Sequence, residues 1–478
     1  MVKRGAVLLA VGAISVIAFR AWDSQQGRPL APWNTFVPDE LRADELDRAD
    51  WDAYLRAEDA AFASVEREVT AELDPADRVP SNRYFDGSPL HPSRFATNWN
   101  RSFALDPDGP PVGAVVMLHG LTDSPYSMRH LAERYRAHGF VAIAIRLPGH
   151  GTVPAGLTEA VWEDWRAAAR LAVREAVRRS GGSVPLHLVG YSNGGALALQ
   201  YALDALDDAS LPRPARVVLI SPMIGVTRFA RFAGVAGIPA IFPAFAKAAW
   251  LDVLPEFNPF KYNSFPVNAA RQTHLLTTVL QAQIDRQARD GRWTSLPPIL
   301  TFQSAVDSTV STSAVIDVLY ARLPANGSEL VLYDLNRSAS FGPLLRPAAG
   351  DALDAMLPAR PRPYRITIVT NESPDSSAVV ERSAEAGALD ERSRPLGLAF
   401  PRGVFSLSHV ALPFPIDDAL YGLAPDPSED FGIRLGAISP RGERGVLVTS
   451  LDSLLRMSSN PFFAYQAARI EETMVTSP

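Results

Sequence analysis

Between residues 113 and 220, short apolar segments alternate with longer amphipathic ones, and this alternation constrains the fold more than any other feature. Continuous apolar runs of this length are typical of strands that are buried on both faces. We expect such strands at 113–118, 140–146, 186–189 and 216–220, with helices at about 126–138, at 158–179 and from Gly194. Strands and helices in strict alternation predict an α/β fold with a mostly parallel, doubly wound sheet.

The chain before and after this core divides by pattern. Short strands are expected at 82–85 and 101–105, so the first half of the core is placed at 81–221. Residues 222–296 are rich in aromatic side chains and break the alternation, and we interpret them as a helical cap over the carboxyl edge of the sheet. The second half, 297–478, resumes with strands at 298–302 and 330–334 around a helix at 311–322, followed by a C-terminal extension. Within that extension we expect a strand at 365–369 and a long loop at 371–394.

The N-terminus carries a different signal. Lys3 and Arg4 precede an uncharged run from Gly5 to Phe19, which as a helix would reach about 22 Å. Snorkelling of Arg20 would lengthen the span, so residues 1–22 are predicted to be a membrane helix, a signal-anchor or a signal peptide. The excess of positive charge before the run would leave the rest of the chain outside the cytoplasm, on the periplasmic side, or secreted if the segment is cleaved. Residues 23–80 are expected to be a tether followed by amphipathic helices.

Composition excludes several classes of protein. Lys and Arg total 46 against 52 Asp and Glu, a net charge of −6, and no basic face is evident, which argues against nucleic acid as a partner. Cysteine is absent, so disulfides, thiol catalysis and thiolate metal sites are excluded. His and carboxylate residues do not cluster at metal-ligand spacing. We therefore expect neither a metal nor a cofactor.

Ser192 is the strongest candidate for a catalytic residue. It lies in Gly190-Tyr191-Ser192-Asn193-Gly194, a G-x-S-x-G pattern directly after one predicted strand and at the start of a predicted helix. In this context the serine occupies a tight turn that lifts its hydroxyl above the sheet edge. The alternative, a structural turn serine, is less consistent with that context.

The turn after the strand 113–118 predicts an anion site. The amide of Leu121 in His119-Gly120-Leu121-Thr122 can point at the same place as the amide of Asn193. Two convergent amides are what a tetrahedral intermediate needs for its oxyanion. His119, and His150 in the turn 147–151, are interpreted as structural.

A general base follows by elimination. In strand–turn–helix hydrolases the chain order is serine, acid, histidine. Only His274 and His409 follow Ser192, and His274 lies in the predicted cap. His409 is therefore the expected base.

Asp307 is the expected acid, since it follows the strand 298–302 and could orient the His409 ring. Its alternative role is the N-cap of the next helix, which Ser308 or Ser311 could equally fill. Asp334 is the second candidate for the acid. Asp417 and Asp418 are expected to face solvent.

Together these residues resemble the α/β-hydrolase superfamily, most closely its carboxylesterase and monoacylglycerol-lipase-like branch. The resemblance rests on HGLTDSP (119–125), LPGHG (147–151), GYSNGG (190–195), NPFKYNSFPVNA (258–269) and the Asp307 segment. It implies a triad of Ser192, Asp307 and His409, an oxyanion hole from Leu121 and Asn193, and a cap that lines an acyl pocket. His409 departs from the family pattern, because typical members place the histidine just after the last core strand.

The expected function is that of a membrane-anchored serine hydrolase that cleaves medium-acyl or lipid-like carboxylic esters through an acyl-enzyme. A thioesterase, acyltransferase or peptidase would use the same triad, and a catalytically silent envelope scaffold on a hydrolase fold is the alternative of a different class. A haloalkane dehalogenase or epoxide hydrolase would need an aspartate in place of Ser192. The expected partners are a small-molecule or lipid ester and, through the N-terminal helix, a membrane. Protein partners remain unassigned.

Overall fold

The computed structural model describes residues 28–225, 243–307, 309–338, 355–401, 404, 406–436 and 459–475, together with 15, 18–19, 22, 26, 240 and 353. The predicted membrane helix at 1–22 lies for most of its length outside these residues. Among the helices that the structure describes, none has the length and apolar character needed to cross a bilayer.

The described strands are β1 (Phe103–Leu105), β2 (Gly113–Leu118), β3 (Phe140–Ile145), β4 (Leu186–Tyr191), β5 (Arg216–Ile220), β6 (Trp250–Asp252), β7 (Phe265–Pro266), β8 (Ile299–Ser304), β9 (Glu329–Tyr333), β10 (Arg365–Asn371), β11 (Ala378–Ala384) and β12 (Arg392–Ala399). The described α-helices are α2 (Pro32–Thr35), α3 (Ala43–Arg48), α4 (Trp51–Val65), α5 (Arg129–Ala137), α6 (Trp162–Ser180), α7 (Asn193–Asp207), α9 (Val267–Arg289), α10 (Thr312–Ala314) and α13 (Phe463–Val475).

Ten of the described strands form one sheet in the order β1-β3-β2-β4-β5-β8-β9-β10-β11-β12. The strands from β3 to β10 in this order pair in parallel, whereas β1, β11 and β12 pair antiparallel to their neighbours. The predicted mostly parallel sheet is therefore confirmed. Because parallel strands end at the same edge, the loops after β2, β4 and β8 gather on one side of the sheet.

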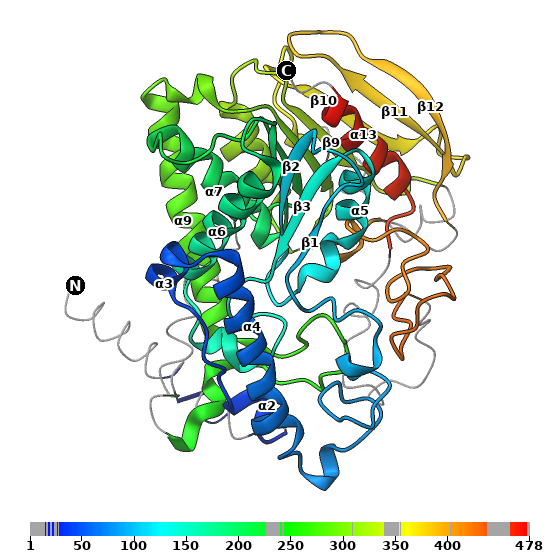
Figure 1. The fold of residues 1–478 in the computed structure, drawn as a ribbon. Coiled ribbons are helices and arrows are strands. Elements are labelled where there is room, and N and C mark those ends of the chain that lie inside the picture. Colours follow the sequence, from blue (N-terminus) through cyan, green and yellow to red (C-terminus); the bar gives the residue numbers. More distant parts are fainter. Residues whose placement is uncertain are drawn as a thin grey trace, which may run out of the picture.

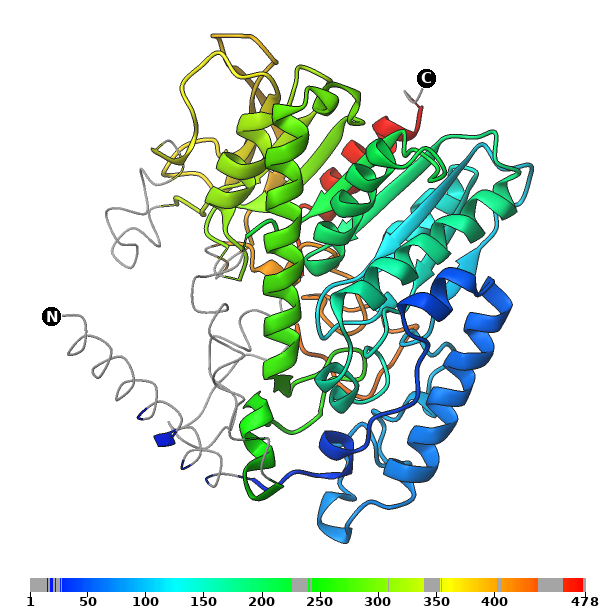
Figure 2. The ribbon, with the colours of Figure 1, turned by 90° about the vertical axis from the view of Figure 1, so that its left-hand side faces the viewer.

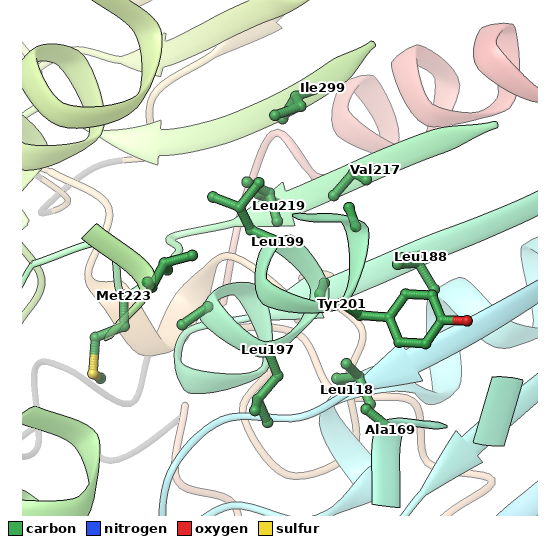
Figure 3. Close-up of a cluster of buried hydrophobic side chains, with 14 of the residues drawn as sticks. Leu118, Ala169, Leu188, Leu197, Leu199, Tyr201, Val217, Leu219, Met223 and Ile299 are labelled. Atoms are coloured by element: carbon green, nitrogen blue, oxygen red, sulfur yellow. The ribbon is translucent and has the colours of Figure 1, made fainter. Parts of the chain in front are cut away.

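Helices cover both faces of the sheet, with α6, α7 and α9 on one face and α5 and α13 on the other (Figure 1). Side chains of β2 alternate between the two faces: Val116 and Leu118 join the core under α6 and α7, while Val115 and Met117 join the core under α5 and α13. Figure 3 shows the first core at α7, whose leucines meet side chains from β4, β5 and β8. Burial on both faces explains why these strands are apolar throughout.

Two expectations were wrong. Residues 82–85 form turns and not a strand, because the side chain of Asn82 accepts a bond from the Tyr84 amide at 3.1 Å and so competes with extended pairing. The predicted loop 371–394 instead contains β11 and most of the β11–β12 hairpin. The charged residues suggested a solvated loop, but they are paired in the structure. Glu381 is 4% exposed and accepts bonds from Arg394 at 2.8 Å and from Tyr465 at 2.9 Å.

Segments outside the sheet take the forms that their sequences favour. Amphipathic helices α3 and α4 occupy the region expected to hold them, and α3 packs against α6. In the region predicted as a cap, α9 packs against α7. The segment between β6 and β7 reaches the loops at the carboxyl edge, where the Tyr262 amide donates to the Thr122 carbonyl at 2.8 Å and the Tyr262 hydroxyl to the Gly149 carbonyl at 3.2 Å. Much of the remainder, 226–239 and 241–242, lies outside the described residues, and the proposed division into domains stays a prediction.

Candidate active site

Ser192 occupies a sharp turn between β4 and α7. Its backbone has φ 55° and ψ −117°, a strained conformation for a residue with a side chain. The flanking glycines permit the turn, since a Cβ at Gly194 would collide with the Leu118 carbonyl and one at Gly190 with the Gly194 carbonyl. Ser192 itself is 4% exposed. The pattern at 190–194 is thus explained by crowding between β4, α7 and the end of β2.

The structure brings Ser192, His409 and Asp307 together. His409 Nε2 lies 2.9 Å from Ser192 Oγ, and His409 Nδ1 lies 2.9 Å from Asp307 Oδ2. The side chains of His409 and Asp307 are 5% and 0% exposed. A neutral imidazole that donates from Nδ1 to a carboxylate presents a lone pair on Nε2, and this lone pair can accept a hydroxyl proton.

Asp307 is held as a carboxylate by its surroundings. Its Oδ1 accepts bonds from the amides of Thr309 at 2.8 Å and Val310 at 3.0 Å, and its Oδ2 also accepts one from Gln303. Burial alone would raise the pKa of Asp307, but the charge and hydrogen bond of His409 and the amide bonds outweigh it, so that the pKa lies below its ordinary value. The N-cap role belongs to Ser311, whose hydroxyl accepts the Ala314 amide at 3.1 Å.

Asp334, the second candidate for the acid, belongs to a different cluster. Its Oδ2 accepts bonds from Arg337 at 2.6 Å and from the Thr370 hydroxyl at 2.8 Å. It lies directly after β9, where its amide donates to the Val369 carbonyl of β10 at 3.0 Å, and the described bonds of its carboxylate do not include His409.

The Leu121 and Asn193 amides lie on the two turns that meet at Ser192. A Cβ built on Gly120 would stand 3.2 Å from the Ser192 Cβ, so the backbone before Leu121 lies against the serine. Asn193 is the first residue of α7, where the helix exposes free N–H groups. Among the hydrogen bonds of the described residues, neither of these two amides donates to a protein acceptor. The described contacts therefore leave both amides without a protein acceptor, next to the turn that carries Ser192.

His119 connects the two turns, whereas His150 bonds within its own turn, where its Nδ1 lies 3.1 Å from the Pro148 carbonyl. His119 Nε2 accepts the Leu147 amide at 3.0 Å, and its Nδ1 lies 2.9 Å from the Gly120 carbonyl. This pattern needs a neutral ring with its proton on Nδ1, and burial, together with His150, lowers the pKa of His119 well below its usual range. Burial likewise lowers the pKa of His150 to about 4.

His409 reaches the site on a loop that follows the β11–β12 hairpin. His409 begins a short 3-10 helix, His409–Ala411. Ser408 caps this helix, because its hydroxyl accepts the Ala411 amide at 3.2 Å. The Tyr191 hydroxyl donates to the His409 carbonyl at 3.4 Å, and the two rings lie 5.3 Å apart. Three residues later, the Leu412 carbonyl accepts a bond from Gln466 of α13 at 3.1 Å. The loop is thus fixed on both sides of the histidine.

Asp418 anchors the same loop, and the expectation that it faces solvent was wrong. Its side chain is 0% exposed, and it accepts bonds from His130 at 2.8 Å, from Tyr126 at 2.9 Å and from Arg129 at 3.1 Å. Burial would raise the pKa of Asp418, but the bond from His130 and the charge of Arg129 hold it well below its usual range. The sequence did hold a signal, because positions 126, 129 and 130 share one helical face. Asp417, by contrast, is exposed as expected.

Replacing Asp418 with alanine is expected to lower the free energy of unfolding by about 3 kcal/mol at pH 7, because Tyr126 and His130 would lose their acceptor and the buried Arg129 would keep only Glu429, at 2.6 Å, as a charged partner. Since the pKa of this carboxyl is depressed in the folded state, its contribution is complete above the unfolded pKa of about 4 and is lost as the pH falls below that value. Urea unfolding from pH 7 to pH 3 measures the difference. Asp417→Ala is the matched control and should change stability by less than about 0.5 kcal/mol. An equal loss in both variants would contradict the anchoring role.

Among the described residues, no group of three or more His, Asp or Glu side chains is placed to hold a metal ion.

Residues 109–337 match the Hydrolase_4 family, which is described as serine aminopeptidase, S33. This match includes Leu121, Ser192, Asn193 and Asp307 but ends before His409.

Two curated relatives show partial similarity. A thermostable monoacylglycerol lipase from Bacillus sp. (strain H-257) is 27% identical over 222 residues, which is 46% of this chain and 80% of the relative. The magnesium-chelatase 30 kDa subunit of Rhodobacter capsulatus is 35% identical over 158 residues, 31% of this chain and 44% of that protein. A solved structure from work on LipS and LipT, two metagenome-derived lipolytic enzymes, has 23% identity and a TM-score of 0.38, covering 49% of this chain and 86% of that one.

Proposed function

Because the chain is an α/β-hydrolase of the esterase and lipase kind, we propose that it hydrolyses carboxylic esters through an acyl-enzyme formed on Ser192. The observation that carries the proposal is the continuous bonding from Ser192 Oγ through the His409 ring to Asp307. The strained turn at Ser192 supports the same role, since such a turn lifts the hydroxyl above the carboxyl edge of the sheet, on the side where substrates of this fold bind.

In the proposed reaction, His409 Nε2 removes the proton from Ser192 Oγ as the oxygen attacks the ester carbonyl carbon. The carbonyl oxygen becomes an oxyanion, to which the amides of Leu121 and Asn193 donate. The imidazolium then protonates the leaving alcohol as the C–O bond breaks. In the second half, water attacks the acyl-enzyme, His409 takes its proton, and the acid leaves as Ser192 regains its hydrogen.

Asp307 has two roles in this proposal. Its bond to Nδ1 fixes the tautomer in which Nε2 carries the lone pair. Its negative charge, held by the low pKa that the His409 bond produces, stabilises the imidazolium. Neither role requires the proton to move onto Asp307.

The proposed substrate is an ester with an apolar acyl chain. Supporting this, the two loops of the site both lead into one aromatic cluster: Tyr126 follows the turn of Leu121, and Phe414 follows His409. Phe260, from the segment between β6 and β7, stacks on Tyr126 with ring centroids 4.1 Å apart. These rings are buried, and an apolar cluster joined to both loops of the site supports a lipid-like over a charged acyl chain. One relative, the monoacylglycerol lipase from Bacillus sp., belongs to the same class.

The experiment is an activity series on 4-nitrophenyl esters of increasing acyl length, beside amino-acid 4-nitroanilides. We expect kcat/KM to rise from acetate to a medium chain by about tenfold for each one to two added methylenes that are buried. The anilides test the peptidase alternative, which the description of the matching family favours. Anilide hydrolysis that exceeds ester hydrolysis would contradict the esterase proposal, whereas ester hydrolysis alone would support it.

We also propose that residues 1–22 hold the catalytic part at a membrane, outside the cytoplasm. The support is the uncharged run from Gly5 to Phe19 after two basic residues. Membrane fractionation of cells that express the full chain or a chain lacking 1–22 tests this. Equal soluble fractions of the two chains would exclude the anchor.

A further inference from the structure

An N-terminal arm, defined here as residues 32–70, packs beside the core outside the part of the chain that the family model matches. It contains α2, α3 and α4 and runs down one side of the molecule in Figure 2. Asp47 on α3 makes a two-point ion pair with Arg170 of α6, at 2.8 and 2.6 Å. This contact docks the arm, but it lies on the outer surface and does not reach the site.

Two other carboxylates of the arm do reach inward, and both contact Arg146 at the end of β3. Glu40 pairs with Arg146 Nη1 at 2.9 Å and Glu58 with Arg146 Nε at 3.0 Å. The side chains of Arg146 and Glu58 are each 2% exposed, and that of Glu40 is 10% exposed. A buried cation between two carboxylates has one low-energy position, because any movement breaks a charged hydrogen bond.

The arm also holds the turn that follows Arg146. Glu40 accepts the Gly149 amide at 3.2 Å, and Arg146 donates to the His150 carbonyl at 2.8 Å. The Tyr54 hydroxyl of α4 donates to the Arg146 carbonyl. The arm therefore binds the backbone of this turn at two points, the Arg146 carbonyl and the Gly149 amide, and Arg146, which the two glutamates hold, binds it at a third.

On its buried side, the turn at 146–150 is hydrogen-bonded through His119 to the turn that carries Leu121. The Leu147 amide donates to His119 Nε2 at 3.0 Å, and the other ring nitrogen of His119 bonds to the Gly120 carbonyl at 2.9 Å. Gly120 in turn lies against Ser192. An unbroken series of bonds thus runs from Glu40 and Glu58 to the backbone that presents the Leu121 amide.

We propose that the N-terminal arm is a positioning element for the oxyanion site, in which Glu40 and Glu58, through Arg146 and His119, set the place of the Leu121 amide. The inference rests on the proposed function, since it assigns Leu121 the role given there. Neither glutamate is a catalytic residue. The oxyanion forms only during the reaction. Displacement of the amide therefore reduces the stabilisation of the transition state and leaves the binding of the ester unchanged.

The first test compares Glu40→Gln with Asp47→Asn in the full chain. Removal of one oxyanion donor typically lowers kcat by about 10²–10³, and we expect a displaced donor to lower it by about tenfold with KM changed less than twofold. Asp47→Asn removes a charge from the same arm without touching Arg146, and it should change kcat less than twofold. If both variants lower kcat equally, the arm merely stabilises the fold and the proposal is wrong.

A double-mutant cycle with His119→Gln supplies a measurement that a structural role would not affect. Once the His119 connection is altered, Glu40→Gln should cost less than a further twofold in kcat, so that the two effects are strongly non-additive. The effects of Asp47→Asn and His119→Gln on kcat should be independent, so that the double variant shows the product of the two single fold-changes. Independent effects of Glu40→Gln and His119→Gln would overturn the proposal. Glu58→Gln, which leaves the Glu40 contacts in place, gives the same readings if Glu40→Gln does not fold.

Ser192→Ala separates failure of this inference from failure of the proposed function. If Ser192→Ala retains ester hydrolysis, the proposed function fails and the inference with it. If Ser192→Ala is inactive while Glu40→Gln has unchanged kcat, only the positioning role is refuted.

Discussion

Replacing His409 with alanine is expected to lower kcat for ester hydrolysis by about 10⁴- to 10⁶-fold, with the fold intact. The reason is geometric, because His409 Nε2, the proposed base, lies 2.9 Å from Ser192 Oγ. Without it, the serine hydroxyl must lose its proton to water. Steady-state kinetics with a medium-chain 4-nitrophenyl ester measure the loss, and circular dichroism checks the fold.

His274→Ala is the matched control for this variant, since His274 is the other histidine that follows Ser192 in the chain. It lies half-buried on α9, and kcat should change less than twofold on its replacement. Full activity of His409→Ala would refute the assignment of the base. Loss in both variants would point to damage of the fold.

Asp307→Asn should lower kcat by about 10⁴-fold while KM stays within a few-fold. The carboxylate of Asp307 accepts a bond from Nδ1, whereas the amide of asparagine can donate one to Nδ1. The ring then carries its proton on Nε2. In this tautomer Nε2 can no longer accept the proton of the Ser192 hydroxyl. The bonds from the Thr309 and Val310 amides to Oδ1 can persist in the variant, so the turn itself is retained. We would measure kcat and the pH–rate profile of Asp307→Asn and compare them with those of the control variant Asp334→Asn.

Asp334→Asn is the control, because Asp334 is the second candidate for the acid in the sequence. It should leave kcat nearly unchanged, because Asp334 bonds to Arg337 and Thr370. A larger loss in Asp334→Asn than in Asp307→Asn would reverse the assignment.

The sheet could be predicted because its strands are buried on both faces, which leaves a continuous apolar run in the sequence. β2 and β3 are examples, with every residue buried. The turn at Ser192 could be predicted for a related reason: the glycines at 190 and 194 are required by close contacts within the turn and with the end of β2. Both signals are local, so a single sequence carries them.

The features that were missed depend on distant partners. β11 looked like a polar loop because Glu381 pairs with Arg394 and Tyr465, which the sequence alone does not bring together. Asp418 looked like a surface residue for the same reason, since Arg129 and His130 lie almost 300 residues earlier. The place of His409 could be found only by elimination, because its loop returns to the site through contacts with Tyr191 and α13.

The central claim is that Ser192 is a nucleophile that His409 activates. The most direct measurement is covalent labelling of the full chain with a fluorophosphonate, followed by intact-mass and peptide mass spectrometry. We expect one label per chain, on Ser192, with no label on Ser192→Ala and labelling of His409→Ala slowed by at least 10³-fold. An unmutated chain that stays unlabelled and does not hydrolyse esters would contradict the account and favour a silent hydrolase fold.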